Sequence, residues 1–177
     1  MTVASIGFIG LGKMGAVMTP HLATGGHLVT GYDISSPAVM PSGVEIAADL
    51  AALAGCGTII TMLPDGEVVN AVIGALLSAG CDAMVIDMSS SHPDISRAMA
   101  TDLAARGQMF IDAPVSGGVG SAEDRGDDGD AVHALRRHDV GRVRSMDSAY
   151  GDRRARRCLS LIHISEPTRL LSMSGGG

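Results

Sequence analysis

The stretch that most constrains this chain of 177 residues runs from residue 6 to residue 33 and reads IGFIGLGKMGAVMTPHLATGGHLVTGYD. Its apolar start, Ile6 to Ile9, ends in a glycine-rich turn, and a pattern of helical period follows. A second apolar run, Leu28 to Tyr32, closes on Asp33. A strand, a glycine turn, a helix, a second strand and an acid in this order predict the first β-α-β unit of a parallel sheet.

The glycines of the turn each have a physical reason. Gly10 permits a sharp turn off the strand, because glycine reaches positive φ at less cost than other residues. Gly12 has no Cβ, so a pyrophosphate can approach the backbone, and Gly15 lets the helix pack closely against the strand. The free N–H groups and the positive dipole end of the helix favour the phosphates. This is the dinucleotide-binding fingerprint, and its predicted cofactor-binding residues are Gly10, Leu11, Gly12, Lys13, Met14 and Gly15.

Asp33 decides the cofactor in this interpretation. Its carboxylate, at the tip of the second strand, can accept hydrogen bonds from the adenosine ribose and repels the 2′-phosphate of NADP. No Arg or Lys lies between Asp33 and Ile46 to neutralise such a phosphate, so we predict NAD. The residues alone leave two alternatives open: a tight glycine turn without a ligand, and Asp33 as a strand-end acid that only meets solvent.

The rest of the chain continues the alternation of strands and helices up to about residue 123. Strands are predicted at 44–46, 58–62, 83–86 and 109–111, and helices at 49–54, 67–77 and 93–106. The alternation predicts an α/β fold, a Rossmann-type doubly wound parallel sheet with helices on both faces. Ligands bind at the carboxyl ends of the strands in such sheets. The segments at those ends are Gly10 to Gly15, Asp33, Met62 to Asp65, Asp87 to Ser90 and Asp112 to Gly118.

Composition excludes several other classes of protein. A net charge of −6 argues against a protein that coats nucleic acid. The three cysteines and six histidines show no metal-ligand spacing, so we expect reduced thiols and no metal site. The uncharged run from Met14 to Tyr32 is broken by Pro20, and no signal peptide pattern is visible. We therefore expect no membrane segment and a cytoplasmic protein.

Four motifs make the sequence similar to the β-hydroxyacid dehydrogenase family, which includes 3-hydroxyisobutyrate dehydrogenase and tartronate semialdehyde reductase. They are GFIGLGKMG (7–15), TMLPD (61–65), DMSSSHP (87–93) and DAPVSGGVGSAE (112–123). The resemblance covers residues 1 to about 123. It implies an NAD-dependent oxidation of a small 3-hydroxy acid to its semialdehyde by hydride transfer.

The resemblance also implies further site residues. Leu63 and Pro64 correspond to a loop that contacts the cofactor near its nicotinamide half, and Ser90 corresponds to a Ser or Thr that touches it. Without the resemblance, Met62 to Pro64 are typical of a plain strand end, and Ser89 to Ser91 are typical of helix-capping residues. Ser116, Gly117 and Gly118 correspond to the segment that holds the substrate carboxylate, where a hydroxyl and successive N–H groups form an anion-binding nest. The alternative for the run Val115 to Gly120 is a flexible linker.

The chain departs from the family after Glu123. Residues 124–157 hold nine Arg and seven Asp without a Lys, and 159–173 look like translated sequencing-adapter DNA. We therefore predict an NAD-binding domain at 1–123 and a non-homologous, disordered tail at 124–177, frameshifted and adapter-derived. The family's all-helical domain, with its catalytic lysine and homo-oligomer interface, is expected to be missing. No catalytic residue is predicted, because Lys13 is the only lysine, and the chain by itself is expected to be inactive.

Three further functions compete with that of an NAD-dependent dehydrogenase. They are a non-enzymatic dinucleotide-binding module, an NADP-using semialdehyde reductase of the same family, and a nucleic-acid binder that uses the arginines after residue 124. Against the last, nine Arg minus seven Asp leave only +2 over residues 124–157, with Tyr150 as the sole aromatic for stacking. The partner that we expect is a small-molecule hydroxy acid, and not a nucleic acid or a membrane.

Overall fold

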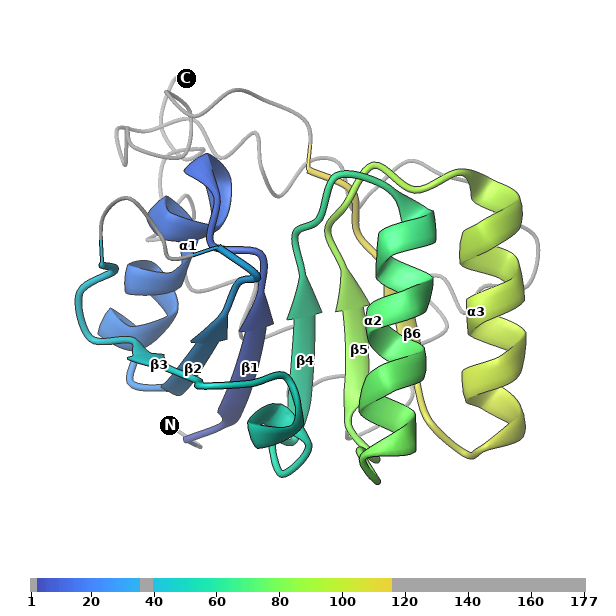
Figure 1. The fold of residues 1–177 in the computed structure, drawn as a ribbon, viewed down its shortest axis with the longest axis horizontal. Coiled ribbons are helices and arrows are strands. Elements are labelled where there is room, and N and C mark those ends of the chain that lie inside the picture. The colour runs from blue at the N-terminus through green and yellow to red at the C-terminus, as the bar shows by residue number, and fades with distance from the viewer. Residues whose placement is uncertain (1–2, 36–39, 116–177) are drawn as a thin grey trace, which may run out of the picture.

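The computed structural model describes residues 3–35 and 40–115, and the fold is reported for these ranges (Figure 1). Strands and helices alternate along them, as the sequence predicts. The strands are β1 (Ser5–Ile9), β2 (Leu28–Tyr32), β3 (Glu45–Ile46), β4 (Thr58–Thr61), β5 (Met84–Asp87) and β6 (Phe110–Asp112). The helices are α1 (Lys13–Thr24), the 3-10 turn η1 (Ala51–Leu53), α2 (Gly66–Ser78) and α3 (Pro93–Ala105).

The strands form one sheet in the order β3-β2-β1-β4-β5-β6, and every neighbouring pair is parallel. The order reverses between β1 and β4, which are adjacent although β2 and β3 lie between them in the sequence. This is the strand order of a Rossmann-type sheet, so the predicted fold class is confirmed. Ligands of such sheets bind where the order reverses, outside the carboxyl ends of the strands.

Apolar residues that alternate along the strands make two cores, one on each face of the sheet. On one face, Ile59 and Val85 of the central strands pack against α2 and α3, which lie side by side in Figure 1. On the other face, Phe8 and Val29 pack against Met18 and Leu22 of α1. Strands buried on both faces carry nearly continuous apolar sequence, which explains why apolar runs located them.

The segment predicted as a helix at residues 49–54 forms only the short turn η1. The carboxylate of Asp49 accepts a hydrogen bond from the Ala52 N–H at 2.9 Å, and the turn ends before Gly55. Glycine is unfavourable in a helix interior, which agrees with the early end. The buried Leu53 anchors the turn in the core beside α2.

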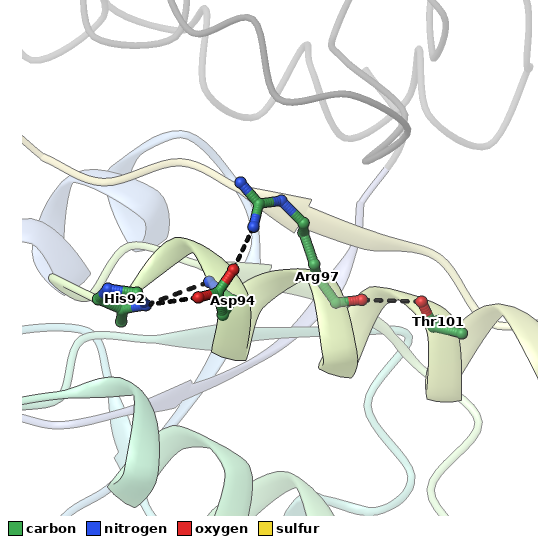
Figure 2. A network of polar contacts seen from close by, with 4 residues as sticks. All are labelled: His92, Asp94, Arg97 and Thr101. Atoms are coloured by element: carbon green, nitrogen blue, oxygen red, sulfur yellow. Dashed lines mark hydrogen bonds and ion pairs between the residues drawn. The ribbon is translucent and has the colours of Figure 1, made fainter.

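Helix α3 begins at a cluster of exposed polar residues (Figure 2). His92 is its N-cap, and the His92 Nδ1 accepts a hydrogen bond from the Asp94 N–H at 3.3 Å. Asp94 also pairs with Arg97, whose carbonyl accepts from the Thr101 hydroxyl at 2.9 Å. Exposed pairs of this kind contribute little to stability beyond fixing the start of the helix, so we assign the cluster a capping role.

The described ranges leave out some of the predicted residues. Ser116, Gly117 and Gly118, and the whole predicted tail at 124–177, lie outside the described residues. Within 3–35 and 40–115, no helix combines the length and the apolar character that crossing a membrane requires.

Candidate cofactor site

Backbone hydrogen bonds join the loops at the carboxyl edge of the sheet. In each of these bonds, the N–H of the first residue after one strand donates to the carbonyl of the last residue of the neighbouring strand. The pairs, donor first, are Gly10–Tyr32 at 2.9 Å, Met62–Ile9 at 2.8 Å, Met88–Thr61 at 2.8 Å and Ala113–Asp87 at 2.7 Å. The parallel ladder is thus extended beyond the strands, and the loops leave the sheet in register along one edge.

The glycine turn has the geometry that its sequence predicts at all three positions. Gly10 has a φ of +100°, and a Cβ built on it would lie 2.2 Å from the Met62 carbonyl oxygen. A Cβ on Gly15 would lie 1.9 Å from the Gly10 carbonyl oxygen and 3.0 Å from Phe8 of β1. These two glycines therefore let β1, α1 and the loop after β4 meet where the strand order reverses.

Gly12 differs from the other two because its side is open. Among the described residues, no atom beyond its own neighbours lies within 4 Å of a Cβ built there. Gly12 is the N-cap of α1, and the first helical turn carries no acid. By contrast, Asp65 caps α2 by accepting from the Val68 N–H at 2.9 Å, and α3 has His92. An exposed glycine at a helix start without a side-chain cap fits an anion such as a pyrophosphate.

The residues between these glycines divide into buried and exposed. Leu11 as a whole is only 2% exposed, and its side chain packs against Gly31 of β2, so Leu11 presents almost no surface to a ligand. Lys13 is exposed at the first position of α1, and Met14 is half-buried. Of the predicted cofactor residues in the turn, Lys13 presents the most accessible side chain.

Asp33 is tied to the glycine turn. Its Oδ2 accepts a hydrogen bond from the Leu11 N–H at 2.7 Å, and its Oδ1 accepts from the Ser35 N–H at 2.9 Å. A carboxylate has about four acceptor positions, so about two remain for the hydroxyls of a ribose. The sequence located this acid but not its bond to Leu11, which only the spatial proximity of β1 and β2 creates.

A second acid, Asp87, organises the loops after β4 and β5. It is fully buried, and its Oδ1 accepts hydrogen bonds from the Thr61 hydroxyl and the Ser89 N–H, both at 2.9 Å. Its Oδ2 accepts from the Ser91 hydroxyl at 2.6 Å. The sequence predicted no role for Asp87 or Thr61 beyond their places at strand ends, and only helix capping for Ser89 and Ser91. The available signal was a polar residue at the end of each of two apolar strands.

This network decides which residues of the two loops face outward. The Ser89 hydroxyl oxygen accepts from the Leu63 N–H at 2.9 Å, so Ser89 and Ser91 are both held inward, while Ser90 between them is exposed. Pro64 is exposed as well, and Leu63 is half-buried. The helix-capping interpretation of these serines is wrong, because the cap of α3 is His92.

Groups with a shifted pKa lie away from this edge. Burial lowers the pKa of His27, which precedes β2, and burial followed by the nearby Cys81 raises the pKa of Cys56, which precedes β4. Both precede the amino ends of their strands. Within the described ranges, His, Cys, Asp and Glu side chains form no group of three or more that could hold a metal ion.

Comparison with known proteins decides the family. The sequence model described as the NAD binding domain of 6-phosphogluconate dehydrogenase matches residues 5–126, which is most of the chain. The chain belongs to this family. The resemblance seen in the motifs is thereby confirmed for the N-terminal part of the chain.

Relatives within this family carry dehydrogenase and reductase names. The mitochondrial 3-hydroxyisobutyrate dehydrogenase of Drosophila melanogaster is 40% identical over 125 residues, covering 67% of this chain and 39% of its own length. The 3-sulfolactaldehyde reductase of Escherichia coli is 38% identical over 121 residues, 64% of this chain and 41% of its own. This chain thus spans about two fifths of the length of these curated relatives.

The same similarity holds in three dimensions. A solved structure of 3-hydroxyisobutyrate dehydrogenase from Mycobacterium tuberculosis with L-serine matches with a TM-score of 0.62 and 32% identity. The match covers 76% of this chain and 50% of that one.

Proposed function

We propose that this chain binds NAD along the carboxyl edge of its sheet and is the cofactor domain of a 3-hydroxyacid dehydrogenase of the 3-hydroxyisobutyrate dehydrogenase type. The observation that carries the proposal is the open side of Gly12 at the uncapped start of α1, with Asp33 fixed to the same turn. The names of the family and of its relatives support it.

The residues at this edge would hold the two halves of the cofactor differently. The N–H groups at the start of α1 would bind the pyrophosphate, and Lys13 adds positive charge at the same helix start. Asp33 would accept hydrogen bonds from the adenosine ribose with its remaining acceptor positions and repel a 2′-phosphate. Leu63, Pro64 and Ser90 would meet the nicotinamide half.

NAD supplies the hydride acceptor of such a reaction, and the protein orients the two reactants and removes the hydroxyl proton. In this proposal Ser116, Gly117 and Gly118 hold the substrate carboxylate, as the family resemblance implies. A positioned general base or acid contributes about 10²–10⁴-fold in rate. The only lysine here, Lys13, stands at the start of α1 beside the phosphate turn, so we expect the 177-residue chain alone to act as a dinucleotide-binding module.

Calorimetric titration of NAD and NADP tests the cofactor assignment. The wild-type chain should bind NAD more tightly, and Asp33→Asn and Asp33→Arg should narrow or reverse the preference, because each removes the negative charge that repels the 2′-phosphate. Asp49→Asn is the matched control, since Asp49 also accepts a backbone hydrogen bond but lies before η1. Absence of NAD binding, or a selectivity that Asp33→Arg leaves unchanged, would refute the proposal.

A further inference from the structure

Asp87 places a carboxylate in the interior at the end of β5, where it is fully buried. A buried carboxylate is unfavourable unless hydrogen bonds replace its hydration. Here it receives hydrogen bonds from three donors, the hydroxyls of Thr61 and Ser91 and the N–H of Ser89. These donors are uncharged, so well-placed neutral hydrogen bonds, and not an ion pair, offset the cost of burying the carboxylate.

The three donors lie on two different segments of the chain. Thr61 ends β4, directly before Met62 and Leu63, whereas Ser89 and Ser91 belong to the loop between β5 and α3. Ser89 makes a second link between these segments, because its hydroxyl oxygen accepts a hydrogen bond from the Leu63 N–H at 2.9 Å. Side-chain hydrogen bonds therefore join the two segments twice, once from Thr61 to Asp87 and once from Leu63 to Ser89.

The two segments are also in close contact where they lead into α2 and α3. A Cβ built on Gly66, the first residue of α2, would lie 3.1 Å from both Cβ and Oγ of Ser91 and 3.1 Å from Ile95 of α3. The starts of α2 and α3 are thus in contact, and the hydrogen-bonded carboxylate lies behind them. A change in the orientation of the Ser91 side chain would therefore displace the start of α2 as well as that of α3.

We propose that Asp87 is a positioning residue for the nicotinamide half of the cofactor site. It fixes Leu63 and Pro64 relative to Ser90, the residues that the proposed function, on which this inference rests, assigns to that half. By holding Ser89 and Ser91 inward it turns Ser90 outward. A role in general stability alone would be served by an apolar side chain, as at Val85 and Ile86 of the same strand.

The test compares NAD with ADP-ribose, which lacks the nicotinamide ring. Thr61→Val removes one hydroxyl donor at nearly constant volume, Thr61→Ser restores it, and Asp87→Asn keeps one carbonyl acceptor. We expect Thr61→Val and Asp87→Asn to weaken NAD binding about tenfold, as expected for a lost hydrogen bond to a charged group, and to leave ADP-ribose within about twofold. Thr61→Ser should bind NAD like the wild type.

Gln108→Leu is the matched control for stability. Its side-chain Nε2 donates to the carbonyls of Cys81 and Ala83 at 3.1 and 3.2 Å, before the amino end of β5. This variant should lower the thermal midpoint without changing the ratio of NAD to ADP-ribose affinity. Amide exchange at Leu63 should accelerate in Thr61→Val and Asp87→Asn but not in Gln108→Leu.

The outcomes separate this inference from the proposed function. Equal losses of NAD and ADP-ribose affinity, or unchanged NAD affinity in both Thr61→Val and Asp87→Asn, would overturn the positioning role and leave NAD binding intact. Wild-type chain that binds the two ligands equally would also overturn it, because the nicotinamide loops would then contribute nothing. Wild-type chain that binds neither would refute the proposed function itself.

Discussion

Asp33 directly follows strand β2, and Asp87 is the last residue of strand β5 in the same sheet. Their surroundings leave them different numbers of acceptor positions for a ligand. Asp33 is half-buried and accepts one hydrogen bond from the Leu11 N–H and one from the Ser35 N–H. Its carboxylate keeps further acceptor positions for a ligand. Asp87 is fully buried and receives three hydrogen bonds from protein groups. The first therefore suits recognition, and the second suits the positioning of other residues.

The glycines of the turn allow a stability test with an internal control. Gly10→Ala should destabilise the fold by about 2–4 kcal/mol, because Cβ would clash with the Met62 carbonyl and φ is +100°. Gly12→Ala meets no described atom and has a φ of −63°, so it should change stability by less than about 1 kcal/mol while weakening NAD binding. Urea denaturation measures the first effect, and equal destabilisation by both substitutions would contradict it.

His27 predicts a pH dependence of stability. Its Nδ1 accepts from the Ala4 N–H at 3.3 Å, its buried Nε2 has no partner among the described residues, and burial lowers its pKa. The folded state thus prefers the neutral ring. Stability from this group should be complete above its ordinary pKa of 6.5 and fall as pH drops from there through the lowered folded pKa.

The measurement is the thermal midpoint as a function of pH in wild type, His27→Gln and His92→Asn. His27→Gln should flatten the decline below pH 6.5, whereas His92→Asn, which keeps a good N-cap at an exposed site, should retain it. An unchanged decline in His27→Gln would show that other groups cause it.

The three helices differ in how their amino ends are satisfied. Asp65 and His92 cap α2 and α3 with side-chain acceptors, and Glu67 and Asp94 place an acid in the first turn of each. Helix α1 has Gly12 as its N-cap, Lys13 as its first residue and no acid in its first turn. Free N–H groups and a nearby cation at a helix start favour a bound anion, so the difference between the helices supports the phosphate position proposed above.

A cap introduced at α1 should separate stability from binding. Gly12 has extended backbone geometry, which an N-cap residue requires, so Gly12→Asp should stabilise the free chain by about 1 kcal/mol. The same carboxylate would compete for the N–H groups and repel the pyrophosphate, so NAD affinity should fall by more than about tenfold. Gly12→Asn should stabilise similarly with a smaller loss of affinity. Tighter NAD binding by Gly12→Asp would place the phosphates elsewhere.

At the scale of the whole molecule, the sequence predicted what depends on periodicity and on the rules of parallel sheets. Apolar runs such as Thr58–Thr61 are buried strands, and the glycine turn stands where the strand order reverses. It did not predict the network around Asp87, because Thr61 and Ser91 are neighbours only after the strands pair. It overpredicted the helix at 49–54, where local hydrogen bonds favoured η1.

The lysine content of the chain predicts the result of an activity assay, because the family resemblance implies a lysine as the group that exchanges the substrate proton. With NAD and 3-hydroxyisobutyrate, the purified 177-residue chain should form no NADH above background, because Lys13 is its only lysine and stands at the start of α1. Absorbance at the NADH band measures this, with the Drosophila relative as the positive control. Turnover that persists in Lys13→Gln would reveal a proton acceptor that we have not assigned.

The bond between Asp33 and Leu11 has a consequence for protein engineering. In the proposed function, redirecting the chain from NAD to NADP would mean exchanging Asp33 for a small or basic residue. Here that exchange would also leave the Leu11 N–H without its acceptor, since Oδ2 receives it at 2.7 Å. Asp33→Arg alone would therefore loosen the glycine turn while it changes the preference, and a stable NADP-binding design would add a new acceptor for the Leu11 N–H.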